Sequence, residues 1–290
     1  MTIETNLARW VDVLAGSHDR ICDLVSELDA DALTRPSRCS DWTIAQVLSH
    51  LGSGAELFKA MLDAVVAGEP TPGREFMPPV WERWNALGPE EQAEAFLSTD
   101  GQLVEALEDL GDRLDELTFT FFGVMQLDAV GFVGMRLSEH ALHTWDVAAA
   151  LDPAATVDPD AVSLLVDRLP QMAQRAGSAE RAPGGLTVRI VTSAPERRFV
   201  LTVDGDVHLV PETTPEPPDA GAGAAGGAGG GEARAGGALP EPEARLPVLR
   251  LPAEAFLRLV AGRLDPAHTP ALDPATEGLV DTLRAVFPGF

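Results

Sequence analysis

Apolar residues recur at intervals of three and four along most of the N-terminal half of the chain, which is the spacing of amphipathic helices. A first helix is predicted over about residues 4–33. A second begins after Thr43, because Thr43 and Gln46 have the form of a capping box. The apolar stripe of this second helix fades near Gly68.

Two further long helices are predicted before the middle of the chain. Residues 89–117 open with proline and acidic residues and carry an apolar stripe of leucines. Residues 128–151 contain no proline, and no glycine after Gly134. Residues 68–89 are rich in proline and glycine and predict a long loop with one short helix, either a lid or an ordinary connection. Four long amphipathic helices predict a four-helix bundle.

The pattern changes in the C-terminal half. Residues 158–176 predict one more helix, which Pro170 should bend or end. Asp204-Gly205 is a hairpin signal between two short apolar runs. The predicted strands cover residues 186–192, 197–203, 206–210 and 247–251, and the predicted short helices cover residues 252–262 and 273–286.

Together these elements predict an α+β protein of two domains. Residues 1–155 would form the helical bundle, and residues 156–290 a small α+β domain with a mostly antiparallel sheet. Residues 212–245 consist mainly of glycine, alanine, proline and glutamate, a composition that predicts disorder.

The composition of the chain argues against some kinds of binding partner. The 290 residues include 45% apolar residues, enough for a sizeable core, and carry a formal charge of −24 from 45 acidic and 21 basic residues. Such a charge disfavours binding to nucleic acid and to anionic membranes. The N-terminus has no signal-peptide pattern and no apolar run is long enough to span a membrane, so we expect a cytoplasmic protein.

The two cysteines, Cys22 and Cys39, do not form a disulfide framework or a Cys/His zinc motif. We expect both to be small buried thiols in a reducing compartment. Lys59 is the only lysine in a chain rich in alanine, glycine and arginine, which indicates a GC-rich coding genome.

Glu139 and His143 lie four residues apart in the fourth predicted helix and therefore point to the same side. A carboxylate and an imidazole so placed can bind one divalent ion if a third ligand comes from elsewhere, and His50 of the second helix is the best candidate. A solvated Glu–His pair and a hydrogen-bonded core position for His50 remain open. His140 is the rival ligand if Glu139 faces water, and Arg136 extends the same stripe.

Two stretches of the chain together resemble one family. Cys39-Ser40-Asp41-Trp42-Thr43-Ile44, continuing to His50-Leu51, fits C-x-x-W-T-hydrophobic followed by H-L, and Glu139 to Asp146 fits E-x-x-x-H-x-W-D. Both patterns are typical of the mycothiol-dependent maleylpyruvate isomerase family, which lies within the DinB-like metal-binding four-helix bundles. The C-terminal half resembles that family's sterol-carrier-protein-like domain, and Leu259–Arg263 resembles its late "GR" turn. The likeness covers nearly the whole chain except the Gly/Ala-rich insertion.

The resemblance implies a divalent cation, usually zinc, on His50, Glu139 and His143, with His140 as a neighbour. An open fourth position marks a catalytic metal site, and a thiol that enters it is deprotonated. In the resembling enzymes this thiol is mycothiol. The implied function is therefore an isomerase or S-transferase, in which metal-bound thiolate adds to a small electrophilic substrate whose identity stays open. Nickel and iron also accept such a ligand set.

Two further residues are candidates for roles in catalysis. Asp146 is expected either to orient His143 or a neighbouring backbone group, or to be an ordinary acid on the helix surface. Arg263 is expected either to pair with a substrate carboxylate across the domain cleft or to form a structural ion pair. Two other functions stay open: a metal-dependent hydrolase that uses bound water, and a non-catalytic binding or regulatory module.

Overall fold

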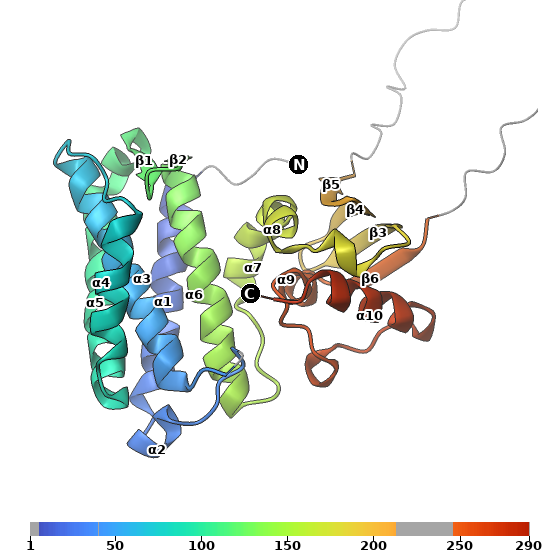
Figure 1. Cartoon of the computed structure of the whole chain (residues 1–290), viewed down its shortest axis with the longest axis horizontal. Coiled ribbons are helices and arrows are strands. Elements are labelled where there is room, and N and C mark those ends of the chain that lie inside the picture. The colour runs from blue at the N-terminus through green and yellow to red at the C-terminus, as the bar shows by residue number, and fades with distance from the viewer. Residues whose placement is uncertain (1–5, 40, 213–245, 290) are drawn as a thin grey trace, which may run out of the picture.

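A computed structural model of the chain describes residues 6–39, 41–212 and 246–289. In this part of the chain a bundle of long helices lies beside a smaller unit built on a four-stranded sheet (Figure 1). The predicted α+β class is confirmed. The predicted disordered segment, residues 212–245, lies outside the described residues except for Glu212.

Four long helices make up the bundle, as predicted: α1 (Leu7–Ser26), α3 (Ile44–Val66), α5 (Pro89–Leu110) and α6 (Ala129–Leu151). Helix α3 packs mainly on α5, and α1 packs mainly on α6. The predicted capping box starts α3, because the Gln46 amide donates to the Thr43 hydroxyl and the Thr43 amide donates to Gln46 Oε1. The first predicted helix is shorter than expected and is followed by a separate short helix, α2 (Ala30–Leu33).

The segment between α3 and α5 contains the one short helix predicted there, α4 (Met77–Asn85), after a 3-10 turn, η1 (Arg74–Phe76). Helix α4 packs on α3, and the buried Trp84 donates from Nε1 to Glu56 Oε2 at 2.8 Å. This contact anchors the connection on the bundle.

The prediction of helix up to residue 117 is wrong beyond Leu110. Gly111 adopts φ +48, which ends α5, and a 3-10 turn, η2 (Gly111–Glu116), follows. A hairpin of β1 (Thr118–Phe121) and β2 (Met125–Asp128), which the sequence reading missed, then leads into α6.

The helix predicted over residues 158–176 is broken into α7 (Pro159–Leu165), a 3-10 turn, η3 (Val166–Arg168), and α8 (Leu169–Ala176). Pro170 lies in the first turn of α8, where a missing amide hydrogen costs nothing, so it starts the second helix and does not end the first.

The sheet has the strand order β5-β4-β3-β6. Its strands are β3 (Leu186–Ser193), β4 (Arg197–Asp204), β5 (Asp206–Pro211) and β6 (Val248–Pro252). The first three pair antiparallel, with Gly205 at φ +73 in the predicted hairpin turn, and β6 pairs parallel to β3. The predicted mostly antiparallel sheet is confirmed.

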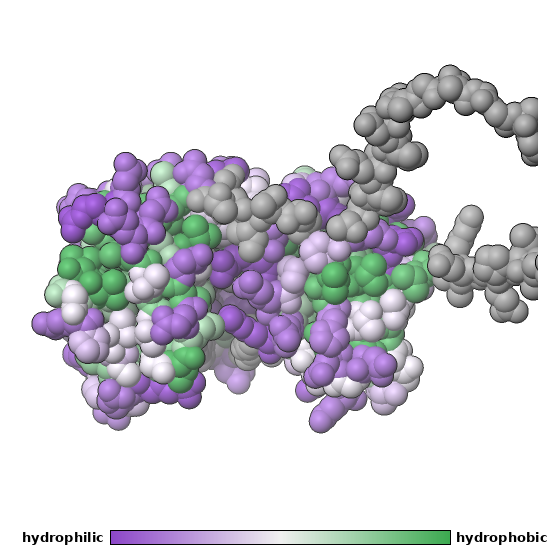
Figure 2. Space-filling model, turned by 90° about the horizontal axis from the view of Figure 1, so that it is seen from above, coloured by the Kyte–Doolittle hydropathy of each residue, from purple (hydrophilic) through white to green (hydrophobic). Residues whose placement is uncertain are grey.

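Helix α9 (Ala253–Val260) is largely buried and packs on β3 and β6 of the sheet and on α7 and α8. Helix α10 (Glu277–Val286) follows it in the chain. Arg258 of α9 lies over the ring of Trp145 of α6 at 4.9 Å, and Trp145 donates from Nε1 to Ala155 O at 3.0 Å. One hydrophobic core runs from the bundle into the sheet. The two units therefore pack firmly against each other, although Figure 2 shows them as two lobes. Among the described residues, no helix combines the length and apolarity needed to cross a membrane.

Gly52 lets α3 approach the indole of α4, because a Cβ there would lie 2.2 Å from Trp84. We expect Gly52→Ala to reduce the free energy of unfolding by about 1–3 kcal/mol, measured in urea, because the hydrogen bond to Glu56 restrains the ring. Gly16→Ala is the matched control. It has no atom within 4 Å of the added methyl and should be neutral or stabilise by up to about 1 kcal/mol. Equal effects of the two substitutions would contradict this packing.

Candidate metal centre

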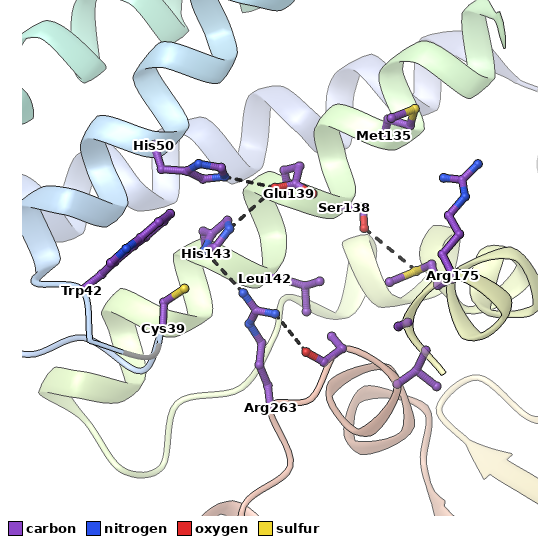
Figure 3. Close-up of a pocket in the computed structure, with 14 residues that line it drawn as sticks. Cys39, Trp42, His50, Met135, Ser138, Glu139, Leu142, His143, Arg175 and Arg263 are labelled. Carbon is purple, nitrogen blue, oxygen red and sulfur yellow. Dashed lines mark hydrogen bonds and ion pairs between the residues drawn. The ribbon is translucent and has the colours of Figure 1, made fainter. Parts of the chain in front are cut away.

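A cavity of about 490 Å³ opens where the bundle meets the C-terminal unit (Figure 3). It is lined from the loop before α3, from α3, α6, α8 and α9, and from the turn after α9. The lining residues are Cys39, Trp42, His50, Met135, Ser138, Glu139, Leu142, His143, Met172, Arg175, Ala176, Val260, Ala261 and Arg263. Both units of the protein therefore contribute to its walls.

The structure brings the three predicted ligands together on one wall of this cavity. His50 projects from α3 toward Glu139 and His143, which lie one turn apart on α6 (Figure 3). His50 Nε2 is 3.3 Å from Glu139 Oε2, and His143 Nε2 is 3.6 Å from the same oxygen. The three ligand atoms all lie within 4.8 Å of one another.

These separations fit a divalent cation. In a tetrahedral site with ligand bonds of about 2.0–2.1 Å, neighbouring ligand atoms are about 3.4 Å apart. Two imidazole nitrogens and one carboxylate oxygen are also a donor set that zinc accepts while keeping one position free. The carboxyl of Glu139 can take this role, because hydrogen bonds and charges of His143 and His50 hold its pKa well below the ordinary value and keep it ionised.

Asp146 fixes the orientation of His143. His143 Nδ1 is 2.9 Å from Asp146 Oδ2, so Nδ1 carries the proton toward the carboxylate and Nε2 faces Glu139 and the cavity. Burial would lower the pKa of His143, but hydrogen bonds to Asp146, Cys39 and Glu139 raise it to about 10. A cation at Nε2 would replace the second proton of this ring.

Arg263 reaches Asp146 from the turn after α9. Its Nε and Nη2 donate to the Asp146 carboxylate at 3.0 and 2.8 Å, and Nη2 lies 3.5 Å from His143 Nδ1. Asp146 is fully buried and Arg263 is 12% exposed. Burial would raise the pKa of the Asp146 carboxyl, but His143 and Arg263 lower it. The guanidinium thus forms the structural ion pair that was one of its two expected roles, and it still lines the cavity.

A second possible set of ligands, formed by Cys39, His143 and Asp146, shares His143 with the first. A cation there would have to compete with Arg263 for the Asp146 carboxylate. It would also need the Nδ1 atom that Asp146 already engages. The chemistry of the donors therefore favours the Nε2 side of His143.

His140 does not take part in this site. Although Glu139 is half exposed, His140 is fully buried and contacts Asp100 and Ser17 on the other side of α6. Arg136 is also turned away from the site, and donates to Asp100 and to the carbonyl of Leu51 inside the bundle. The prediction that Arg136 extends the stripe of Glu139 and His143 is therefore wrong.

Several cavity residues were missed or judged differently from the sequence. Cys39 lines the cavity as a half-buried thiol, and Trp42 stacks beside His143 with ring centroids 6.4 Å apart. Their places in the C-x-x-W motif were the signal for both. Arg175 of α8 lies far from any motif and had no such signal.

Comparison with known proteins agrees with the motifs. Residues 14–148 match the model of the family described as mycothiol maleylpyruvate isomerase N-terminal domain, the family that the motifs resemble. An uncharacterized protein of Mycobacterium tuberculosis, found in two strains, is 24% identical over 169 residues, which cover 58% of this chain and 80% of that protein.

Two solved structures share the fold of nearly the whole chain. A histidine-to-alanine mutant of the mycothiol-dependent maleylpyruvate isomerase aligns with a TM-score of 0.62, covering 91% of this chain and 92% of its own. A second structure of the same enzyme aligns with a TM-score of 0.61, covering 94% and 99%. Both are 14% identical to this chain, so the likeness establishes the common fold, including the C-terminal unit.

Asp146 is the buried hydrogen-bond partner of His143 and Arg263, so removing its carboxylate should reduce the stability of the fold. We expect Asp146→Ala to lower the free energy of unfolding by about 3–5 kcal/mol in urea, because Arg263 is left buried without its counter-charge. The control is Glu196→Ala, which breaks a surface pair with Arg198 whose side chains are 70% and 49% exposed. It should change the same quantity by less than about 0.5 kcal/mol. A small loss in both variants would show that the Asp146 contacts do not stabilise the fold.

Proposed function

We propose that this protein is an enzyme that uses mycothiol as a cosubstrate and acts on a small electrophilic substrate as an isomerase or S-transferase. A divalent cation, most simply zinc, would be held by His50, Glu139 and His143. The observation that carries the proposal is the convergence of these three side chains on one wall of a 490 Å³ cavity. The family model that the bundle matches and the shared fold of the solved isomerases support it.

When bound, the cation would supply Lewis acidity that lowers the pKa of a thiol entering its free position. Residues of the chain would keep the ligand His143 in position. Asp146 holds His143 by Nδ1, so that the ring keeps its Nε2 atom toward the cavity. Arg263 in turn holds Asp146 in place from the C-terminal unit.

The substrate is proposed to carry a carboxylate. Although the chain has a net charge of −24, the described residues that line the cavity include two arginines, Arg263 and Arg175, and one acidic residue, Glu139. Glu139 is itself a proposed ligand, so a bound cation would neutralise it. Arg263 has a guanidinium N–H beyond those given to Asp146 and Ala261, and can donate it to an anion.

Much of the remaining lining is apolar and would exclude water from a bound reactant. Met135, Leu142, Met172 and Val260 come from α6, α8 and α9, so the dry part of the cavity depends on both units. Desolvation strengthens the electrostatic interactions of the charged groups beside it. This arrangement favours a reaction of a thiolate with a small organic acid.

Metal analysis tests the ligand set. Because each histidine supplies one of three protein ligands, we expect His50→Ala and His143→Ala to lose most of the bound metal after dialysis, measured by plasma mass spectrometry. Asp146→Asn should weaken zinc affinity by about 10–100-fold, since it perturbs the orientation of His143. His208→Ala, at an exposed position on β5, is the control and should keep its metal. Unchanged metal in the first two variants would refute the site.

Titration with mycothiol tests the cosubstrate. We expect calorimetry to detect binding to zinc-loaded protein and to lose it after chelation, because the thiol needs the cation to become a thiolate. A panel of small unsaturated carboxylates should be turned over only when mycothiol is present. Turnover without thiol would point to a hydrolase that uses bound water, and neither binding nor turnover would point to a non-catalytic module.

A further inference from the structure

A second cavity, of about 460 Å³, lies beside the cavity of the candidate metal centre. It is lined from the loop before α3, from α3 and α4, and from the first turns of α5. The lining residues are Trp42, Gln46, His50, Ser53, Trp81, Asn85 and Gln92. Trp42 and His50 also line the first cavity, so the two cavities are neighbours that share these two side chains.

Helical spacing places most of these side chains. Gln46, His50 and Ser53 follow one another at intervals of four and three on α3, and therefore share one face of that helix. Trp81 and Asn85 are four residues apart on α4 and share a face in the same way. The packing of α4 on α3 brings the two faces together around the second cavity.

Uncharged polar groups dominate the walls of the second cavity. Its described lining residues include no aspartate, glutamate, lysine or arginine, although the chain has 45 acidic and 21 basic residues. Ser53 and Gln92 are buried, whereas Gln46 and Asn85 are exposed. A charged ligand would lose its hydration here without meeting a counter-charge, so the cavity suits a neutral ligand.

The polar walls offer both donors and acceptors of hydrogen bonds. Gln46 Oε1 accepts from the backbone at the start of α3, which leaves Nε2 to donate. Gln92 donates from Nε2 to a backbone carbonyl of α4, and no group in the described part of the chain donates to its Oε1. The Ser53 hydroxyl donates to a carbonyl of its own helix and can still accept. Hydroxyl groups, which both donate and accept, match such a mixture.

Two indole rings at the second cavity are unusually open to solvent. Trp42 is 37% exposed and Trp81 is 41% exposed. Figure 3 shows the Trp42 indole beside His50 and His143, and its ring centroid is 5.2 Å from that of His50. The electron-rich face of an indole packs well on the C–H groups of a saturated ring. Indole faces together with amide groups favour a polyhydroxylated ring, such as that of a sugar or a cyclitol.

We propose that the second cavity binds the sugar and cyclitol part of mycothiol while the sulfur lies at the free position of the cation in the first cavity. This inference rests on the function proposed above. His50 connects the two places, because its Nε2 is 3.3 Å from Glu139 Oε2 and its side chain also lines the second cavity. The arginines of the first cavity remain for the substrate carboxylate, so the two reactants meet different walls.

Other occupants fit the second cavity less well. A metal ion would find one imidazole, that of His50, and no carboxylate or thiol among the described lining residues. An anion would find neither arginine nor lysine there. The proline- and glycine-rich connection between α3 and α5 is therefore assigned as a wall of the cosubstrate site, to which α4 contributes Trp81 and Asn85.

Binding of a thiol-free fragment tests the second cavity without metal. The probe is N-acetylglucosaminyl-inositol, titrated into chelated protein. We expect the indole N–H signals of Trp42 and Trp81 to shift in NMR spectra, and those of the buried Trp10 and Trp145 to stay in place. Trp81→Ala should weaken fragment binding about 10-fold. Phe76→Ala is the matched control, because Phe76 is a 36% exposed aromatic residue just before α4 that lines neither cavity.

Calorimetry on zinc-loaded protein tests the whole cosubstrate. Trp81→Ala should bind mycothiol about 10-fold more weakly than the parent, and Trp81→Phe should recover most of the affinity because it keeps a ring face. N-acetylcysteine, which lacks the sugar and the cyclitol, should bind the parent and Trp81→Ala equally. Urea unfolding and metal analysis confirm that each variant is folded and loaded.

The outcomes separate this inference from the proposed function. Equal affinity of folded Trp81→Ala and parent for mycothiol would overturn the inference and leave the proposed function standing, as would a fragment that shifts no indole signal. Glucose that binds as tightly as the fragment would show a general sugar site and overturn the assignment to mycothiol. No binding of mycothiol or N-acetylcysteine to the zinc-loaded parent would overturn the proposed function and this inference with it.

Discussion

The structure of the site depends on one buried carboxylate. Asp146 accepts hydrogen bonds from His143 of its own helix and from Arg263, which lies 117 positions later in the chain. Asp146 is fully buried, and an unpaired buried charge would strongly destabilise the folded protein. The carboxylate therefore keeps both partners in contact with it. One interaction therefore orients a proposed metal ligand and fixes the C-terminal unit against the bundle.

Helix α6 separates two polar networks by its geometry. Successive residues of an α-helix point about 100° apart, so Glu139 and His143 face the cavity while Arg136 and His140 face the bundle interior. The interior pair meets Asp100, and the cavity pair meets His50. Adjacent residues in one motif thus serve different networks, and the proximity of His140 to Glu139 in sequence has no consequence for the ligand set.

Local sequence patterns predicted most helices and strands and the three candidate ligands. Contacts between residues far apart in the chain, such as the pair of Asp146 and Arg263, had no local signal. Spacing alone placed Glu139 and His143 on one face, His50 of the second predicted helix was the candidate third ligand, and the resemblance supported all three. The ion pair of Asp146 with Arg263 could not be deduced, because nothing near Asp146 in the sequence specifies an arginine from the other unit. Gly111 ended α5 early through its positive φ, a backbone property that the apolar stripe on its own does not encode.

The division of labour between the two units follows from these contacts. All three proposed ligands come from α3 and α6, so the bundle alone carries the donor set. Arg175, Arg263, Met172 and Val260 come from the C-terminal unit and supply the charge and apolar surface that a substrate would meet. We infer that the bundle sets the metal chemistry, while the C-terminal unit sets which molecule reaches it. Because Arg263 also holds Asp146, a change of substrate preference in that unit would act on the ligand geometry as well.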